Sequence, residues 1–404
     1  MRYPLRFISS RDRDSLTRAF AGAGVDPYGV AIIGKKAETL VLRVDRVSAP
    51  VANIIKQQLL SIGGDAAVHR DVITGGPEQS SVYIVADRNR LAQLPTKLAR
   101  QAFGLDELGA GIERLLHILE HPPRRVCLPR GEMDLTCGPV VMGVLNVTPD
   151  SFSDGGAFLD PDAACEHAVK MVEEGAGVID IGGESTRPGA AEISADTELA
   201  RILPVLHKLA GRITVPLSID TRHASVARAA LEAGAAIIND VSALRHDPAM
   251  IAAAREAGAA VVAMHMQGTP ETMQADPRYD DAVSEIITWL EERAEELVRA
   301  GIDREKIIID PGIGFGKRLE DNVGLLNQIG DLRGLGFPVM TGYSRKAFIG
   351  KITGREPAER LPGGLAALAK CLAGDVAIVR VHDVKETADF IKVWRAIERA
   401  GAHS

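Results

Sequence analysis

One repeated pattern constrains the fold of this chain more than any other feature. From about Val140 onward, a short run rich in β-branched residues is followed by a polar or glycine-rich loop and then by an amphipathic segment. The runs are VVMGVLNV, VIDIGG, PLSID, AIINDV, VVAMHM, IIIDPG, PVMTGY and AIVRVHDV. The segments between them, such as DAACEHAVKMVEEGA, have apolar residues at helical spacing and close on glycine, which is typical of helix ends.

Eight such units over about 265 residues match the size and alternation of a (β/α)8 TIM barrel, whose active site lies at the carboxyl ends of its strands. A doubly wound open sheet is the alternative, and it requires helices on two faces and a topological switch point. Periodicity does not separate these architectures, but the count of eight strands favours the barrel. We therefore predict an α/β chain built on a TIM barrel.

The first part of the chain differs from this repeat. ETLVLRV, AAVHRDVI and SSVYIVA are strand-like, whereas PVANIIKQQLLSI, LAQLPTKLARQAF and LDELGAGIERLLHIL are helical in pattern. We predict a small α+β domain of unknown role over residues 1–120, a stiff linker over residues 121–134 and the barrel over residues 135–404. Asp12-Arg13-Asp14 is the D-x-D sequence of the first domain and predicts a helix cap, so we assign that domain no catalysis.

The composition of the chain limits the kinds of ligand that we expect it to bind. The formal net charge is -7 and aromatic residues make up 4% of the chain. Both values argue against nucleic-acid binding, which needs a basic surface and often stacking aromatics, although a local basic pocket for a small anion is still compatible with them. The four cysteines lack metal spacing, and we find no signal peptide and no apolar run of roughly 18 residues. We expect a cytoplasmic protein with reduced thiols and no membrane segment.

Polar residues end nearly every predicted strand. An isolated Asp or Asn at a strand end is more often a cap or turn former than a catalyst. Here many such residues arrive at one rim, and caps have no reason to converge. The strand ends carry Asn146, Asp180, Asp220, Asn239, Asp240, Met264, His265, Asp310, the segment 343–346, Arg380 and His382.

The chemistry of this set is of two kinds. Asp220, Asn239, Asp310 and Lys346 offer acceptors and donors on rigid strand ends. Such groups suit the edge of a flat heterocycle that bears N–H and amino groups.

The second kind is cationic or polar. Arg187, Arg380 and His382, together with Asn146, suit phosphate oxygens. We expect Mg²⁺ as a partner because an asparagine oxygen is a hard ligand. A heterocycle site beside a diphosphate site predicts group transfer with diphosphate as the leaving group.

Two glycine-rich loops, TPDSFSDGG and GGESTRPGA, complete the predicted rim. Their glycines permit bending and close backbone approach, so we expect lids that order over substrate. Neither loop fits the P-loop or G-x-G-x-x-G pattern, and Gly312 to Lys317 lacks the Rossmann spacing. The sequence therefore gives little support to dinucleotide binding.

A family resemblance rests on motifs that occur in one order along the barrel. VMGVLNVTPDSFSDGG, DIGGESTRPGA, SIDT, IINDVSAL, MHMQGTP, DPGIGFGK, SRKAFIG and RVHDV together resemble the dihydropteroate synthase family of pterin-binding TIM barrels. The resemblance covers residues 138–397. It implies condensation of 6-hydroxymethyl-7,8-dihydropterin diphosphate with p-aminobenzoate to 7,8-dihydropteroate and diphosphate, in folate biosynthesis. It also implies competition by sulfonamides and, as a family-level expectation, a homodimer.

The resemblance also implies residue roles. The pterin pocket would consist of Asp220, Asn239, Asp310, Lys346, Met264 and Phe315. The aminobenzoate pocket would consist of Phe152, Thr186, Pro188, Ser344 and Lys346. The Mg²⁺ diphosphate would meet Asn146 as metal ligand and Arg187, Arg380 and His382. In this family diphosphate is expected to leave first, so stabilisation of the leaving group and of a pterin-methyl cation supplies most of the catalysis. The expected catalytic residues are Asp154, near the cation, with Lys346, Arg380 and His382.

Some charged residues in these motifs have structural interpretations. We predict that His265 has a backbone-facing role or packs in the core, that Lys317 is a solvated loop charge and that Glu184 is either structural or functional. Two alternatives to the synthase stay open, a pterin-binding methyltransferase barrel and a catalytically silent pterin-binding protein. The methyltransferase would not need the S-T-R-P loop, Ser344-Arg345-Lys346 or the cationic pair Arg380 and His382. A protein that only binds a pterin would not need the intact first glycine-rich loop or the cationic cluster.

Overall fold

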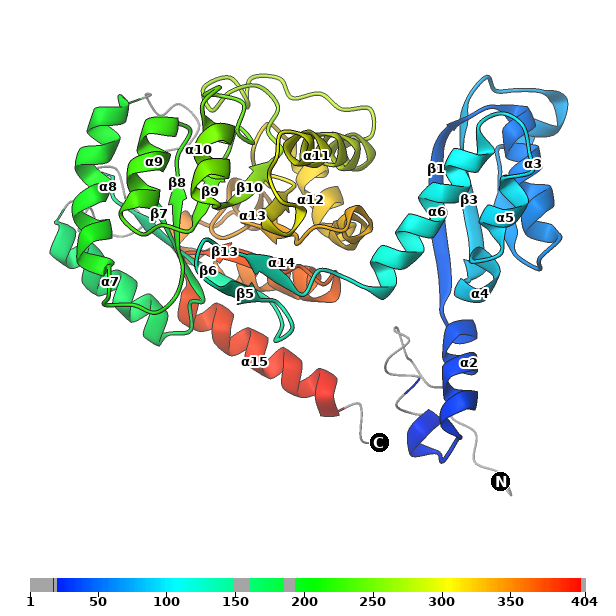
Figure 1. Ribbon diagram of the computed structural model, residues 1–404, viewed down its shortest axis with the longest axis horizontal. Helices are drawn as coiled ribbons and strands as arrows, with labels where there is room; N and C mark the ends of the chain where they lie inside the picture. Colours follow the sequence, from blue (N-terminus) through cyan, green and yellow to red (C-terminus); the bar gives the residue numbers. More distant parts are fainter. Residues whose placement is uncertain (1–16, 18–19, 149–159, 185–192, 401–404) are drawn as a thin grey trace. The chain divides into compact units, whose positions relative to one another are not determined.

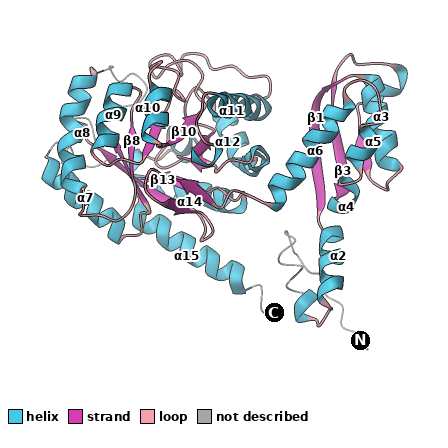
Figure 2. Ribbon diagram, in the orientation of Figure 1, coloured by secondary structure: helices cyan, strands magenta, loops and turns pink. Residues whose placement is uncertain are grey.

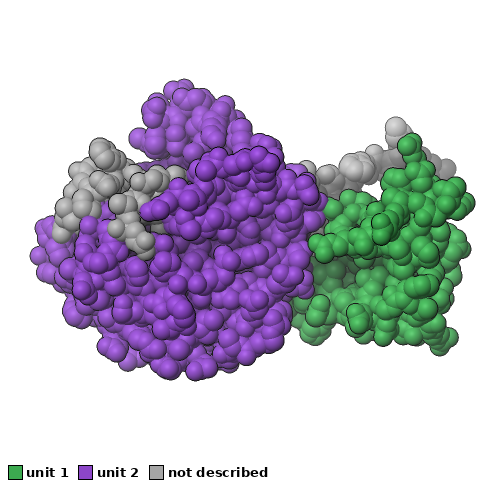
Figure 3. All heavy atoms as spheres, turned by 90° about the horizontal axis from the view of Figure 1, so that it is seen from above, with its two compact units in different colours: residues 1–121, 394–404 green, residues 122–393 purple. Residues whose placement is uncertain are grey.

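The computed structural model describes residues 17, 20–148, 160–184 and 193–400, and the statements below refer to these residues. The chain divides into two compact units, residues 1–121 with 394–404 and residues 122–393, which Figure 3 shows in different colours. None of the described helices is both long and apolar enough to cross a membrane.

Eight parallel strands form the sheet of the second unit (Figure 2). They are β6 (Val140–Asn146), β7 (Val178–Gly182), β8 (Leu217–Asp220), β9 (Ile237–Asp240), β10 (Ala260–Met264), β11 (Ile307–Asp310), β12 (Met340–Thr341) and β13 (Ile378–Val381). Their order is β11-β10-β9-β8-β7-β6-β13-β12, and a parallel bridge between Ile309 and Val339 links the two ends. The sheet therefore closes, which confirms the predicted barrel and excludes the doubly wound alternative.

Helices follow the strands and surround the barrel (Figure 1). They are α7 (Pro161–Glu173), α8 (Ala195–Leu209), α9 (Ala224–Glu232), α10 (Met250–Ala257), α11 (Ala282–Arg299), α12 (Leu319–Asn327), α13 (Ala347–Thr353), α14 (Leu361–Ala373) and α15 (Val384–Ala400), with short 3₁₀ turns η3 (Arg304–Lys306), η4 (Ile329–Leu335) and η5 (Pro357–Glu359). Side chains cap several of them, since Asp160 accepts from the Asp162 amide and Ser194 from the Thr197 amide. Their apolar faces pack on the outward residues of the strands.

Strand residues alternate between these helices and the barrel interior. Ile179 and Ile181 of β7 belong to the core shared with the helices, so Val178 and Asp180 face the opposite, interior side. The amino-terminal half of the interior is apolar and consists of Met142, Val178, Ile237, Ala260, Val262, Ile308, Met340 and Ile378. The interior becomes polar toward the carboxyl ends of the strands, where the predicted site residues lie.

A hairpin lies within the segment 121–134 that we predicted to be a linker. β4 (Arg125–Cys127) and β5 (Glu132–Asp134) pair antiparallel, and Val126 and Met133 are buried in the apolar interior cluster of the barrel. The hairpin thus closes the amino-terminal mouth of the barrel. Strands of three residues are too short to show a periodicity in the sequence.

The first unit has the predicted mixture of helices and strands. Its antiparallel sheet has the order β1-β3-β2, with β1 (Thr39–Val47), β2 (Asp65–Ala67) and β3 (Ser80–Asp87). Its helices are α2 (Pro27–Ala37), α3 (Ala49–Leu60), α4 (Arg88–Leu91), α5 (Leu94–Leu98) and α6 (Leu105–Glu120), with the 3₁₀ turn η1 (Arg70–Thr74). A separate apolar core, which includes Ile55, Ile84 and Leu98, holds this unit together.

Three details of this unit differ from the sequence prediction. The strand expected in AAVHRDVI stops at Ala67, because His69 caps the 3₁₀ turn that follows by accepting from the Asp71 amide. The helix expected in LAQLPTKLARQAF is broken into α4 and α5. Pro95 has no N–H to donate back to Leu91, so the helix cannot continue there. Helix α2 was not predicted.

Candidate functional site

The carboxyl ends of the strands bring most predicted site residues to one rim of the barrel. Asn146, Asp220, Met264 and Asp310 are the last residues of β6, β8, β10 and β11, and Asn239 is the next to last of β9. The strand register places Asp220 beside Asn239 and Met264 beside Asp310. Parallel strands end on the same face of a barrel, so these side chains converge as predicted.

The guanidinium of Arg380, in β13, connects two carboxylates at this rim. Its Nε donates to Asp180 Oδ2 at 2.6 Å, and its Nη2 donates to Asp220 Oδ2 at 2.8 Å. Asn239 Nδ2 donates to the same Asp180 oxygen at 3.0 Å. Residues predicted for the heterocycle and for the diphosphate are therefore joined in one network.

We had predicted that Asp180 lies at the end of its strand, but it does not. β7 continues to Gly182, so Asp180 lies deeper in the barrel and is fully buried. We had given it no role in the site. A signal was present in the sequence, because Asp180 is a charged residue at an inward position of the apolar run VIDIG.

Burial and neighbouring charges set the ionisation of this network. Burial raises the pKa of Asp220 to about 7; Arg380 opposes that shift and Asp180 adds to it. Burial lowers the pKa of Arg380, but the carboxylates of Asp180 and Asp220 outweigh burial and raise it above its usual value. Two carboxylates thus share one guanidinium, and one of them changes protonation near neutral pH.

A second group of site residues lies at the ends of β11 and β12. The Gly312 amide donates to Asp310 Oδ1 at 2.7 Å, and Lys346 Nζ lies 4.5 Å from the centroid of the Phe315 ring. Lys346 also donates to the Ile313 carbonyl. Burial lowers the pKa of Lys346 to about 8, while Asp310 opposes the shift. The predicted ammonium, carboxylate and aromatic wall therefore occur together.

A small apolar cluster lies among these polar groups. It consists of Val241, Met264, Met266 and Met273, with Phe315 packed against it. Thioethers are polarizable and adapt their shape, so the cluster offers a wall suited to a flat ring. The sequence predicted Met264 and Phe315 for this wall and missed the other members.

Ser344 and His382 are neighbours. Ser344 Oγ lies 3.2 Å from His382 Nδ1 and accepts a hydrogen bond from the His382 amide at 3.3 Å. The loop that carries Ser344 is held by Arg345, which donates to both carboxylate oxygens of Asp383 at 2.6 and 3.2 Å. A residue predicted for the aminobenzoate and one predicted for the diphosphate thus lie side by side.

Lys317 is not the solvated loop charge that we predicted. Its side chain is buried, its Nζ donates to the carbonyl oxygens of Phe315 and His265 at 2.9 and 3.3 Å, and Nζ lies 2.9 Å from His265 Nδ1. Burial lowers the pKa of Lys317 to about 7 and that of His265 to about 2, so the imidazole stays neutral. His265 is buried as predicted and packs edge-on against the Trp289 ring.

The two acidic residues next to the rim have structural surroundings. Glu184 is buried, and both its oxygens accept from Arg222 Nη2 at 3.0 Å, so it forms an ion pair. Glu198 of α8 was not singled out from the sequence. It is fully buried against Gly183, and burial raises its pKa to about 8, which makes it neutral at pH 7.

Some predicted site residues lie outside the described residues. They are Phe152, Asp154, Thr186, Arg187 and Pro188. Their positions and the lid role of the two loops stay predictions.

The residues at the strand ends suit a Mg²⁺ ion only when substrate phosphate oxygens supply most of its other ligands. Among the described residues, no three His, Cys, Asp or Glu side chains form a group that could hold a metal ion. A side chain at Gly182 would lie 3.6 Å from Asn146 Oδ1 and 3.6 Å from Asp220 Cβ, so this glycine leaves space between them. Mg²⁺ commonly keeps waters and substrate phosphate oxygens as ligands, and a single asparagine oxygen suits that chemistry.

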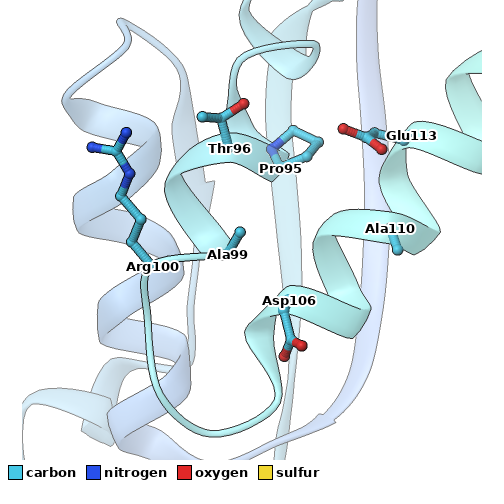
Figure 4. A pocket seen from close by; sticks show the side chains of 7 residues that line it. All are labelled: Pro95, Thr96, Ala99, Arg100, Asp106, Ala110 and Glu113. Carbon is cyan, nitrogen blue, oxygen red and sulfur yellow. The ribbon is translucent and has the colours of Figure 1, made fainter.

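A hollow in the first unit differs from the rim in its chemistry. It lies between α5 and α6, and its lining residues are Pro95, Thr96, Ala99, Arg100, Asp106, Ala110 and Glu113 (Figure 4). Figure 4 shows the Arg100 side chain pointing away from α6, which carries Asp106 and Glu113. The charged groups of this hollow do not converge on one point. The barrel rim is therefore the candidate active site.

Comparisons with known proteins agree with this geometry. Residues 142–382 match the model of a family described as pterin binding enzyme. Dihydropteroate synthase of Escherichia coli (strain K12) is 46% identical over 258 residues, which are 64% of this chain and 91% of that protein. The family match begins near the first barrel strand and leaves the first unit uncovered.

Solved structures of dihydropteroate synthases are also similar to this chain. The structure of Yersinia pestis dihydropteroate synthase with a sulfonamide drug complex has a TM-score of 0.66 at 43% identity and covers 68% of this chain and 99% of that chain. The structure of dihydropteroate synthase from Xanthomonas albilineans in complex with 7,8-dihydropteroate has a TM-score of 0.61 at 42% identity, with coverages of 68% and 98%.

Proposed function

The chain belongs to the family of pterin-binding enzymes and catalyses the dihydropteroate synthase reaction of folate biosynthesis, and from this premise we propose how the residues of the rim divide the work. The reaction joins 6-hydroxymethyl-7,8-dihydropterin diphosphate to p-aminobenzoate and releases diphosphate. The C–O bond between the pterin methylene and the diphosphate breaks, and diphosphate keeps the electron pair. The amine nitrogen then bonds to the methylene carbon and loses a proton.

The pterin binds among the strand ends in this proposal. Asp220 and Asn239 accept and donate along one edge of the ring, and Asp310 and Lys346 meet another part of it. Met264 and Phe315 form the apolar walls. The observation that carries this assignment is the network in which Arg380 bridges Asp180 and Asp220 while Asn239 is bonded to Asp180.

The diphosphate binds beside the pterin. Arg380 and His382 meet its oxygens, with Arg187 from the second glycine-rich loop, and Asn146 provides an oxygen for Mg²⁺. When bound, Mg²⁺ neutralises part of the charge that collects on diphosphate as it leaves. The protein contributes fixed cations and donors, which need no rearrangement when the charge develops.

The aminobenzoate pocket lies next to this site. Ser344 is adjacent to His382, which supports a carboxylate contact of aminobenzoate close to the diphosphate contact. Phe152, Thr186 and Pro188 complete this pocket. Lys346 lies between both substrates, and Asp154 stabilises the electron-poor methylene carbon.

The direct test is a diphosphate-release assay on the full chain with pterin diphosphate and Mg²⁺. We expect release that depends on p-aminobenzoate and on Mg²⁺, and that is strongly reduced in Asn239→Ala. Folded protein that releases no diphosphate would contradict the function, whereas normal turnover by Asn239→Ala would contradict only the pterin pocket. Ser218→Ala, a buried interior change in neighbouring β8, serves as the matched control and keeps full turnover.

We extend the proposal to assembly and location on the strength of the family resemblance. The protein works in the cytoplasm as a homodimer. Analytical ultracentrifugation at micromolar concentration checks the assembly, and a single species with the mass of one chain would contradict it.

A further inference from the structure

Asp180 holds two side chains that the proposed function assigns to different parts of one substrate. Its Oδ2 atom accepts from Asn239 Nδ2, which belongs to the pterin pocket, and from Arg380 Nε, which belongs to the diphosphate pocket. We propose that Asp180 is a positioning residue that orients both parts of the pterin diphosphate site through this one oxygen. The inference rests on the proposed function and adds a residue to it.

The contact with Asn239 fixes the orientation of an amide. Because Nδ2 of Asn239 is bonded to the buried carboxylate, its Oδ1 is turned away from Asp180 and is presented as an acceptor. Without the carboxylate, either end of the amide could face the ring. Asp180 therefore determines which hydrogen-bonding group of the pterin Asn239 recognises.

The contact with Arg380 fixes the orientation of a guanidinium. Nε is held by Asp180 and Nη2 by Asp220, so the planar group is clamped at two of its three nitrogens. Nη1 is the nitrogen that these two bonds leave for the diphosphate. A planar fork held on two sides loses little conformational freedom when it binds an anion.

A comparison with Asp240 separates this role from a purely structural one. Asp240, in the next strand but one, is also fully buried, but its two oxygens accept from the backbone amides of Ser242 and Leu244 at 2.7 and 3.1 Å. Asp240 therefore holds a turn. The hydrogen bonds of Asp180 among the described residues go to the two substrate-facing side chains, and its Oδ1 is buried without a partner there. A carboxylate placed to hold the backbone would use that oxygen.

The test compares two ligands by calorimetry, 6-hydroxymethyl-7,8-dihydropterin with and without its diphosphate, on the full chain. In Asp180→Asn the amide oxygen can take the place of Oδ2 and accept from both donors, but it carries no charge, so both hydrogen bonds become weaker and hold the two side chains less firmly. We expect both ligands to bind on the order of tenfold more weakly, the size of the difference between a hydrogen bond to a charged acceptor and one to a neutral acceptor. The KM for p-aminobenzoate stays unchanged in steady-state turnover.

Matched variants show whether the effect of Asp180 on ligand affinity depends on the side chains that it holds. In an Asn239→Ala background, Asp180→Asn has little further effect on the ligand without diphosphate, because the side chain through which it acts is gone. Asp240→Asn lowers the melting temperature without changing the ratio of the two affinities. Asp180→Ser, which removes the charge with a smaller side chain, repeats the pattern of Asp180→Asn and provides the comparison in a second folded variant.

Three results would overturn the inference. They are unchanged affinities in a folded Asp180 variant, an equal loss with and without Asn239, and a loss confined to the KM for p-aminobenzoate. Failure of the proposed function has a different signature, because then the unaltered chain would neither bind the pterin nor release diphosphate.

Discussion

Replacement of Gly312 by alanine tests how tightly the glycine loop after β11 is built into the site. Gly312 has φ +67°, and an added Cβ would lie 2.0 Å from the carbonyl oxygen of His265. The adjacent chain segments must therefore separate by more than about 1 Å to reach an ordinary contact. The amide of Gly312 also donates to Asp310, so such a shift displaces a pterin carboxylate.

The expected cost follows from three separable effects. A left-handed conformation costs an alanine about 1–2 kcal/mol. The clash adds about 1–3 kcal/mol of overpacking, and a weakened hydrogen bond to Asp310 adds about 1.5–3 kcal/mol. We expect Gly312→Ala to lower the free energy of unfolding by about 4 kcal/mol or more. Gly258→Ala is the matched control, because Gly258 has φ +64° and an added Cβ would meet Lys306 Nζ at 3.4 Å, a flexible neighbour. It should lose only about 1–2 kcal/mol.

Urea denaturation followed by tryptophan fluorescence measures both values. In a Trp394→Phe background, Trp289 is the remaining tryptophan of the chain, and it packs against the His265 ring with centroids 4.9 Å apart. The reporter therefore lies beside the predicted clash. Equal destabilisation by Gly312→Ala and Gly258→Ala would refute the close-approach reasoning and leave only backbone strain.

Three further predictions concern charge and the second substrate. Glu198 has a folded pKa raised by burial to about 8, so the folded state binds more protons than the unfolded state from about pH 4.3 to 8 and its contribution to stability falls as pH rises through that window. Glu198→Gln lacks this loss. Its urea midpoint, relative to that of the unaltered chain, should therefore be higher at pH 9 than at pH 5, and an equal difference at both pH values would contradict the prediction. Because burial raises the pKa of Asp220 to about 7, pterin affinity measured by calorimetry rises from pH 6 to 8, and Asp220→Asn removes that rise. A rise that persists in Asp220→Asn would assign it to another group. A sulfonamide raises the KM for p-aminobenzoate without lowering kcat in steady-state assays, and inhibition indifferent to aminobenzoate concentration would place the drug elsewhere.

The barrel and the set of rim residues followed from local patterns. β-branched runs and helical spacing are properties of short segments, so eight repeats were enough to identify the fold. Asp220, Asn239 and Asp310 were found because polar residues at the carboxyl ends of parallel barrel strands lie on the same rim. These predictions needed no knowledge of distant partners.

Other features depended on contacts between distant segments. Lys317 was misassigned because its burial comes from the approach of its loop to the His265 carbonyl, 52 residues earlier in the chain. The role of Asp180 depends on Arg380, which is 200 residues away. A sequence pattern shows that a residue faces inward, but it does not show which charge it meets there.

The shared guanidinium changes the expected consequence of removing Arg380. From the sequence, Arg380→Ala should retain pterin and lose only diphosphate affinity, because the two groups of residues were separate. In the structure, Arg380 also compensates Asp180 and Asp220. Its removal leaves two carboxylates close together in a buried site without their shared cation, which raises the pKa of Asp220 further and weakens the pterin contacts as well. The pterin and diphosphate pockets are therefore one electrostatic unit, and a cation that binds the leaving group also opposes the effect of burial on the pKa of the pterin carboxylate Asp220.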